Sequence, residues 1–144
     1  MTGKIGSLLN YLFAALSLTF GIIYLTRSSF MPYHGLALAL NWNEVEQNTQ
    51  FLILGLMRAV SGGFIVSSVT IIFLQYKFST DKSSWIPSLI FIIGIIIEST
   101  TLYATLVVRL NTPGNPPVSL AILGLVLLFA GFILNQKSLH GALK

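Results

Sequence analysis

Four long apolar segments strongly restrict the fold of this chain. A helix needs about 20 residues to cross a hydrocarbon core about 30 Å thick, and residues 5–26, 51–76, 85–108 and 117–136 reach that length. Only 8% of the residues are charged and the mean hydropathy is +0.83, whereas a soluble domain carries about 25% charged residues. The sequence therefore predicts an all-α polytopic membrane protein, with residues 1–144 forming one antiparallel bundle of four transmembrane helices.

The connections between these segments are short except for the first. Residues 27–50 form the sizeable loop, and residues 35–40 within it are too few apolar residues to cross a bilayer. We therefore expect a short interfacial helix there, over the outer mouth of the bundle, with Trp42 at the level of the lipid headgroups. Residues 111–117 contain three prolines and end a helix.

The positive charges predict how the chain is oriented. Five lysines lie on the side of both termini and of the second connection: Lys4, Lys77, Lys82, Lys137 and Lys144. Arg27 and Arg109 border the opposite side. Because Lys and Arg are enriched in cytoplasmic loops, both termini are expected in the cytoplasm. The four segments leave no room for a soluble domain, so we expect membrane lipids as partners and no nucleic acid, and a homo-oligomer stays open.

Two charged residues interrupt the apolar segments. Arg58 lies within residues 51–76 and Glu98 within residues 85–108, and a charge at the centre of a membrane helix costs roughly 2.5–3.5 kcal/mol even on the lenient insertion scale. Counted from the predicted outer ends, Arg58 lies about 12 Å deep and Glu98 about 16 Å deep. The two are therefore expected to form a bidentate ion pair. The pair either fixes the register of two helices or exchanges with a ligand headgroup, a proton or an ion.

Small and polar residues recur at helical spacing, and we expect them to mark the packed faces of the helices. The first segment carries Asn10, Ala14, Ser17, Gly21 and Tyr24. The second carries Gly55, Ala59, Gly62 and Val66, which places Arg58 on the inward face. The fourth segment, with Gly124 and Gly131, is the most apolar and is predicted to be a structural wall.

A polar track leads outward from Glu98. Thr101, Thr105 and Arg109 follow it at helical spacing and point toward the loop that holds Tyr33 and His34. These residues are the predicted ligand-binding set together with Arg58 and Glu98. The alternative is that these residues have only structural roles. The threonine hydroxyl groups would then donate to backbone carbonyls of their own helix, and Arg109 would pair with Glu44 or Glu46. His34 would be a hydrogen-bonding loop residue rather than a proton acceptor.

Catalytic patterns are missing from the sequence. The chain has no cysteine, no His, Asp or Cys group at metal-ligand spacing, no phosphate-binding glycine loop and no serine in a nucleophile elbow. We therefore expect no cofactor, no metal site and no catalytic residue, and an enzyme is the less favoured interpretation.

The stretch from Arg58 to Phe64, Arg-Ala-Val-Ser-Gly-Gly-Phe, follows a loop containing Phe30, Met31, Pro32, Tyr33 and His34. It resembles small bacterial four-helix membrane proteins of the DoxX-like and domain-of-unknown-function 4345 kind. The resemblance covers about the first two segments. It implies a compact four-helix bundle in a bacterial inner membrane, and no established activity comes with it. The redox role attributed to some relatives is not carried over, since their cysteines are missing here.

Three functions remain open. The first is the binding of a small amphiphilic or acidic ligand in the outer half of the bundle, with Arg58 and Glu98 as anchors. The second is a proton-coupled small transporter that uses Glu98 as its carrier. The third is a structural or accessory subunit whose polar core only sets the helix register.

Overall fold

The computed structural model describes residues 2–141; Lys144, part of the predicted charge bias, lies outside them. Its elements are α1 (Thr2–Thr26), α2 (Pro32–Leu38), the short 3-10 helix η1 (Trp42–Glu44), α3 (Gln47–Asp81), α4 (Ile86–Asn111) and α5 (Val118–Gly141). The described chain contains no strand. Helices α1, α3, α4 and α5 are each long and apolar enough to cross a membrane. The fold is therefore all-α, with four candidate spans as predicted.

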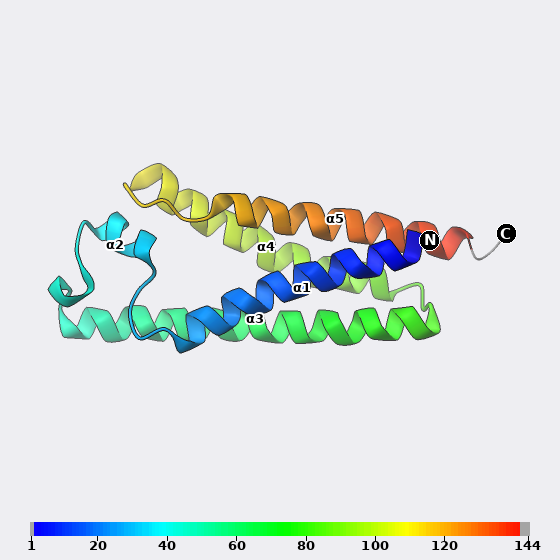
Figure 1. Ribbon diagram of the computed structural model, residues 1–144, viewed down its shortest axis with the longest axis horizontal. Helices are drawn as coiled ribbons and strands as arrows, with labels where there is room; N and C mark the ends of the chain where they lie inside the picture. Colours follow the sequence, from blue (N-terminus) through cyan, green and yellow to red (C-terminus); the bar gives the residue numbers. More distant parts are fainter. Residues whose placement is uncertain (1, 142–144) are drawn as a thin grey trace.

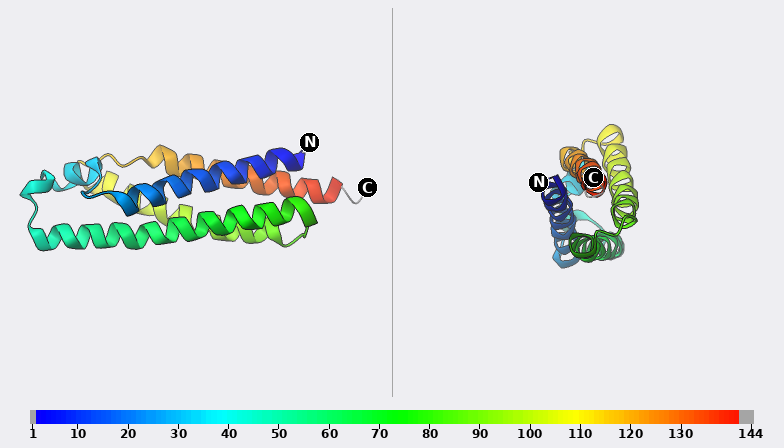
Figure 2. Two further views of the ribbon diagram at one scale, coloured as in Figure 1. Left: turned by 60° about the horizontal axis from the view of Figure 1, so that its bottom comes forward. Right: turned by 90° about the vertical axis from the view of Figure 1, so that its right-hand side faces the viewer.

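The four long helices form an elongated bundle (Figure 1). Helix α1 packs against α3 and α5, and α4 packs against α5 and α3, so that the four helices surround a common core in the end-on view of Figure 2. Helix α1 begins and α5 ends at one end of the bundle, which we call the terminal end. Helix α2 covers the opposite end, which we call the α2 end.

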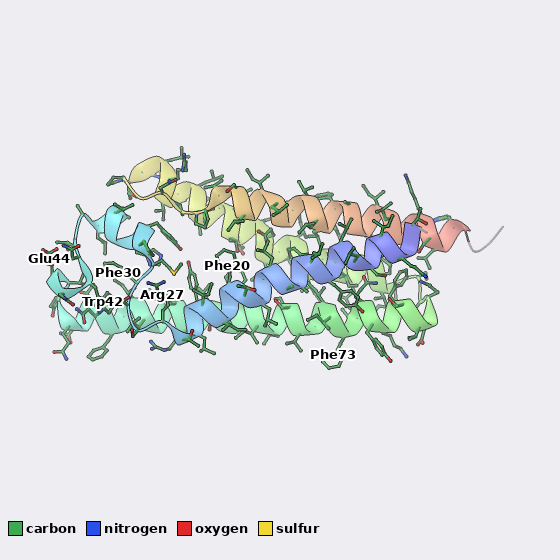
Figure 3. All side chains as sticks on the ribbon, viewed as in Figure 1. Phe20, Arg27, Phe30, Trp42, Glu44 and Phe73 are labelled. Atoms are coloured by element: carbon green, nitrogen blue, oxygen red, sulfur yellow. The ribbon has the colours of Figure 1, made fainter. Side chains whose placement is uncertain are left out.

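Helix α2 is a short cap held by local geometry. Pro32 occupies its first turn, where a missing N–H costs nothing, and Ala39 ends it in the left-handed conformation with φ of 53°. A Cβ on Gly114 would lie 2.9 Å from the Tyr33 carbonyl oxygen, so α2 rests directly on the loop between α4 and α5. Below it, the rings of Phe30 and Trp42 meet edge to face at 5.0 Å (Figure 3). A helix thus forms in the predicted loop, and its contact with a membrane interface stays a prediction.

Helix α3 is longer than a membrane span requires. Its 35 residues extend roughly 52 Å. Gly21 of α1 packs against Phe64 and Ile65 of α3, and α1 ends at Thr26, five residues further on. The turn of α3 that contains Arg58 therefore lies at or beyond the end of α1. Helix α3 continues past this level to Gln47, as the left side of Figure 1 shows.

The buried face of α3 differs from the predicted one. Its buried residues are Met57, Ser61, Phe64, Ser68, Ile71, Gln75 and Phe78. The predicted stripe of Gly55, Ala59, Gly62 and Val66 is exposed, and a Cβ added to Gly55 or Gly62 would meet nothing within 4 Å. Phe73, on the outer side of the same helix, points away from the bundle in Figure 3. The expectation that the small residues of this helix face inward is therefore wrong.

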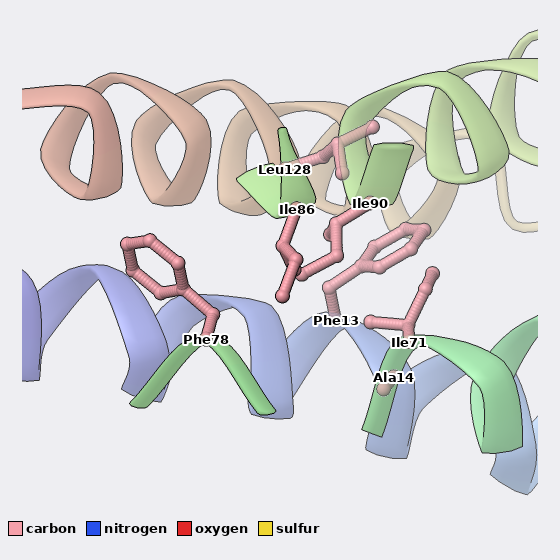
Figure 4. Packing of buried hydrophobic residues seen from close by; sticks show 7 residues of the cluster. All are labelled: Phe13, Ala14, Ile71, Phe78, Ile86, Ile90 and Leu128. Atoms are coloured by element: carbon pink, nitrogen blue, oxygen red, sulfur yellow. The ribbon is translucent and has the colours of Figure 1, made fainter. Parts of the chain in front are cut away.

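The apolar core lies in the half of the bundle toward the terminal end. It is built from Phe13, Ala14, Ile71, Phe78, Ile86, Ile90 and Leu128 (Figure 4). Each of these side chains is at most 1% exposed. All four long helices contribute to this core, so it holds them together at one level.

A buried group of polar side chains accompanies this core, and we call Ser7, Asn10, Gln75 and Asn135 the amide cluster. The Nδ2 groups of Asn10 and Asn135 both donate to Oε1 of Gln75, at 2.7 and 3.0 Å. The Nε2 group of Gln75 donates to Oγ of Ser7 at 2.8 Å. The three amide side chains are at most 1% exposed. The cluster therefore ties α1, α3 and α5 together through hydrogen bonds.

Two glycines give the amide cluster its close fit. A Cβ on Gly6 of α1 would lie 2.5 Å from Oδ1 of Asn135, and a Cβ on Gly131 of α5 would overlap Oδ1 of Asn10. Each helix thus carries a glycine four residues before an asparagine, and each asparagine packs on the glycine of the other helix. Because a membrane gives helices little hydrophobic drive to associate, such close approach and hydrogen bonding set the register.

Candidate functional site

Glu98 is the buried acid of the bundle, and its position depends on a glycine. It lies on the inward face of α4 and is 6% exposed. A Cβ on Gly124 of α5 would lie 2.6 to 2.9 Å from the atoms of the Glu98 carboxyl group, so the end of the Glu98 side chain packs directly on Gly124. Among residues 2–141, Glu98 has no hydrogen-bond or ion-pair partner within the protein.

The carboxyl group borders a cavity of about 50 Å³, which we call the Glu98 cavity. Ser17 of α1 borders the same space, is 4% exposed, and its Oγ has no hydrogen-bond partner. A water needs roughly 10–15 Å³ of such volume, so the cavity holds several waters or a small polar head. Its lining is Leu16, Ser17, Phe20, Tyr24, Tyr33, Phe64, Glu98, Thr101, Thr105, Pro117, Leu120 and Ala121.

Two tyrosines close the cavity toward the α2 end. The hydroxyl groups of Tyr24, near the end of α1, and Tyr33, on α2, are hydrogen-bonded to each other. Burial raises the pKa of Tyr33 above its ordinary value, and the hydrogen bond to Tyr24 raises it further. Tyr33 is therefore a neutral hydroxyl at physiological pH. This pair links the cap to the transmembrane part of the site.

His34 stands just beyond the tyrosine pair. Its ring contacts Tyr33 at 4.3 Å and Tyr24 and Phe30 at 6.5 Å, all near perpendicular, and its Nδ1 accepts a hydrogen bond from the Met31 N–H at 3.3 Å. Burial lowers the pKa of His34. The imidazole is therefore neutral at physiological pH and packs as an aromatic ring.

Two further hollows continue from the Glu98 cavity toward the surface of the bundle. The first, of about 200 Å³, shares Tyr24, Tyr33, Phe64, Thr101 and Thr105 with the cavity, and we call it the connecting hollow. The second, of about 350 Å³, shares Tyr24, His34, Val60 and Val108 with the connecting hollow, and we call it the apolar groove. Together they form a path from Glu98 to the exposed gap between α3 and α4 below α2.

The predicted ion pair of Arg58 with Glu98 does not form. Arg58 is exposed, whereas the preceding residue on α3, Met57, is buried. Within the described chain, the ion pair present joins Lys77 to Asp81. The pair fails for a geometric reason: residue 50 does not mark the boundary of the bundle, because α3 extends past the end of α1, so Arg58 lies near that boundary and on the outer face of the bundle. Long Arg side chains at such a level reach polar surroundings without a partner.

The predicted polar track exists in part. Thr101 and Thr105 line the Glu98 cavity, while their hydroxyl groups donate to the backbone carbonyls of Ile97 and Leu102. Arg109 does not join them: it is exposed and hydrogen-bonded to Asn115 of the following loop. Of the seven predicted site residues, the structure gathers Glu98, Thr101, Thr105 and Tyr33 around one cavity, places His34 on the adjoining hollows, and leaves Arg58 and Arg109 outside.

Ser17, Phe20, Tyr24 and Phe64 border the cavity but are not among the predicted site residues. Ser17 and Tyr24 belong to the polar stripe of α1, so the sequence carries a signal for them. Phe20 and Phe64 are bulky apolar residues on helices where most residues are apolar. Nothing in the sequence distinguishes these rings from lipid-facing ones.

The lining defines what the site can do chemically. It offers one carboxyl group, several hydroxyl groups and three aromatic rings from α1 and α3, and it contains no Lys, Arg or His. Such a site accepts hydrogen bonds and favours positive charge. No group of three or more His, Cys, Asp or Glu residues that could hold a metal occurs in residues 2–141. Comparison of the chain with protein-family models, curated proteins and solved structures gives no match.

Proposed function

We propose that this protein binds a small amphiphilic ligand in the Glu98 cavity. One observation carries the proposal: Glu98 and Ser17 are both more than nine-tenths buried and border the same cavity, the Ser17 Oγ has no hydrogen-bond partner, and Glu98 belongs to no ion pair of residues 2–141. Burying polar groups without partners costs free energy. Hydrogen bonds from a bound polar group would offset this free-energy cost. In a purely structural core, we would expect the Glu98 and Ser17 side chains to bond to each other.

The path to the surface supports an amphiphilic ligand. The Glu98 cavity is polar at its base, while the apolar groove is lined by aliphatic residues such as Ile53, Leu56 and Val60. Ligand sites of this kind combine an apolar wall with a few placed polar groups. A ligand with a polar head and an apolar body fits this arrangement, with its head in the Glu98 cavity and its body along the apolar groove.

The proposed setting is an antiparallel four-helix bundle in a bacterial inner membrane, with both termini in the cytoplasm and α2 in the outer interface. Four lysines of the described chain, Lys4, Lys77, Lys82 and Lys137, lie near the terminal end, which supports this orientation by the positive-inside rule. The ligand would then enter from the outer leaflet. Membership among DoxX-like proteins stays a prediction.

Native mass spectrometry of the protein in a mild detergent with added dodecanol tests the proposal. Ala121 is buried in the cavity wall and Ala59 is exposed on α3, so Ala121→Leu and Ala59→Leu make the same change inside and outside the site. We expect the wild type and Ala59→Leu to retain one bound dodecanol and Ala121→Leu to lose it. Equal binding by all three proteins would refute a ligand site at this place.

Proton-coupled transport through Glu98 is the second candidate, because a carboxyl group facing a cavity inside a membrane helix is a common feature of proton relays. Transport predicts a pH-dependent flux in liposomes that disappears in Glu98→Gln. The close-packed amide cluster toward the terminal end favours binding over transport, since the hollows that adjoin the Glu98 cavity lie toward the α2 end. A structural or accessory subunit remains if neither binding nor flux depends on Glu98.

A further inference from the structure

The lining of the Glu98 cavity contains an acidic side chain and no basic one, and this bears on the charge of the ligand's head group. Glu98 is the carboxyl group of the lining, and no Lys, Arg or His shares the cavity with it. Arg58 and Arg109, the nearest candidates by sequence, are exposed. A carboxylate in a low-dielectric site is stabilised by a positive charge that also donates hydrogen bonds.

The aromatic residues of the cavity favour the same head group. The Phe64 ring lies 6.5 Å from the Phe20 ring and 6.4 Å from the Tyr24 ring, so these three side chains form one continuous wall of the cavity. Aromatic faces attract ammonium groups, and aromatic cages bind quaternary ammonium ligands. A carboxyl group and an aromatic wall around the same space are therefore complementary to an amine that carries a positive charge.

We propose that the ligand is a lipophilic amine, whose ammonium group binds Glu98 and Ser17 and whose apolar body lies along the connecting hollow and the apolar groove. This inference rests on the proposed function and adds the chemical class of the ligand. On α4, Glu98 and Val108 are ten residues apart, so the path from the head to the groove is about 15 Å long. Tyr24 borders all three spaces, and the apolar body must pass beside it.

The source of the amine is a free amphiphile rather than an amine-headed phospholipid. The cavity volume of about 50 Å³ suits an ammonium group with few substituents. A phosphodiester next to that group would need a cation or several N–H donors, and none of the side chains that line the cavity provides a cation. We therefore exclude a phosphate from the head.

Three probes with the same tail test the charge class: dodecylammonium, dodecanol and dodecanoate, each titrated against the protein in nanodiscs of phosphatidylcholine. We expect dodecylammonium to bind about tenfold to a hundredfold more tightly than dodecanol, as for a hydrogen bond to a charged group, and dodecanoate to bind least. Glu98→Gln should abolish this preference, because it removes the charge that distinguishes the three head groups. Glu46→Gln is the matched control, because Glu46 is exposed and far from the cavity in sequence.

The outcomes separate the two proposals. If dodecanol or dodecanoate binds as tightly as dodecylammonium, and Ala121→Leu removes that binding, a ligand site exists but the amine assignment is wrong. If Ala121→Leu changes the binding of none of the probes, the proposed function fails as well. If nanodiscs of phosphatidylethanolamine displace dodecylammonium, the amine belongs to a lipid and the free-amphiphile assignment is overturned.

Discussion

The two halves of the bundle bury polar side chains in opposite ways. Toward the terminal end, the amide groups of Asn10 and Asn135 both donate to Gln75, and their partnerless Oδ1 atoms pack closely on Gly131 and Gly6. Toward the α2 end, Glu98 and Ser17 face a cavity and bond to no protein group. Both arrangements occur in an apolar bundle, where an unsatisfied group is costly. The difference shows that the first half is closely packed between its helices, whereas the second half contains a cavity, which is where we propose that a ligand binds.

Removing the centre of the amide cluster should have the largest effect. Gln75→Leu deletes the acceptor of two asparagine amides and the donor to Ser7. Each polar group left without a partner lowers the free energy of unfolding by about 1–3 kcal/mol. For the three groups together we expect a loss of about 3 kcal/mol, at the low end of this range, because polar groups of the unfolded chain in a membrane also find partners. Thermal unfolding in detergent micelles measures it. A loss below about 0.5 kcal/mol, the ordinary range of surface changes, would contradict a structural role for the cluster.

A matched pair of glycine substitutions on α5 compares the halves directly. Gly131→Ala places a methyl group against Asn10, which is short and held by Gln75, so we expect a loss of about 1–3 kcal/mol as for an overpacked core. Gly124→Ala meets the flexible carboxyl end of Glu98, which has an open cavity beside it, and should cost under about 1 kcal/mol. The same unfolding measurement applies to both. An equal loss in the two variants would show that the Glu98 side chain is as tightly held as the amide cluster.

The Glu98 carboxyl group itself should contribute nothing to stability. Glu98→Gln keeps the side-chain shape and removes an ionisable group that has no protein partner, so the free energy of unfolding should stay equal or rise by up to about 1 kcal/mol. Ligand binding should fall in the same variant, which is the usual trade between stability and function at a site. A loss of more than about 1 kcal/mol would mean that the carboxyl group supports the fold, and the contrast between the halves would then disappear.

The sequence predicts the number and order of the four long helices, because each must be long enough to cross the hydrocarbon and the prolines and charged loops separate them, but it does not predict the full length of α3. It also predicts the polar track of Glu98, Thr101 and Thr105, and these three residues do line one cavity. It does not predict which face of α3 is buried. In a membrane both faces of a helix are apolar, so only small and polar residues distinguish them. Helix α3 offers two such stripes, and Ser61, Ser68 and Gln75, spaced by seven residues, mark the buried one.

The predicted Arg58–Glu98 pair fails because of the length of helix α3, not because of the types of the two residues. Because α3 is 35 residues long, its first residues do not mark the boundary of the bundle, and a depth counted from them is wrong by several turns. The amide cluster is missed for a different reason: Asn135 begins the polar end of the most apolar helix, and the sequence does not distinguish it from Gln136 and Lys137, which follow it. The repeated glycine and asparagine spacing in α1 and α5 is the signal that could have revealed it.

The smallest expected effect concerns pH and again separates the two halves. Burial among the rings of Tyr24, Phe30 and Tyr33 lowers the pKa of His34 below its ordinary value of 6.5. Below pH 6.5 the unfolded chain therefore binds a proton that the folded chain resists, so stability is fully present above pH 6.5 and declines as the pH falls below it. We expect His34→Gln to reduce this decline, and His140→Gln, a change of the exposed histidine at the terminal end, to leave it unaltered. The free energy of unfolding, measured between pH 5 and 8, tests this prediction. If both variants follow the wild-type pH dependence, His34 is not buried among the rings of Tyr24, Phe30 and Tyr33. The α2 end would then be more open than the structure describes.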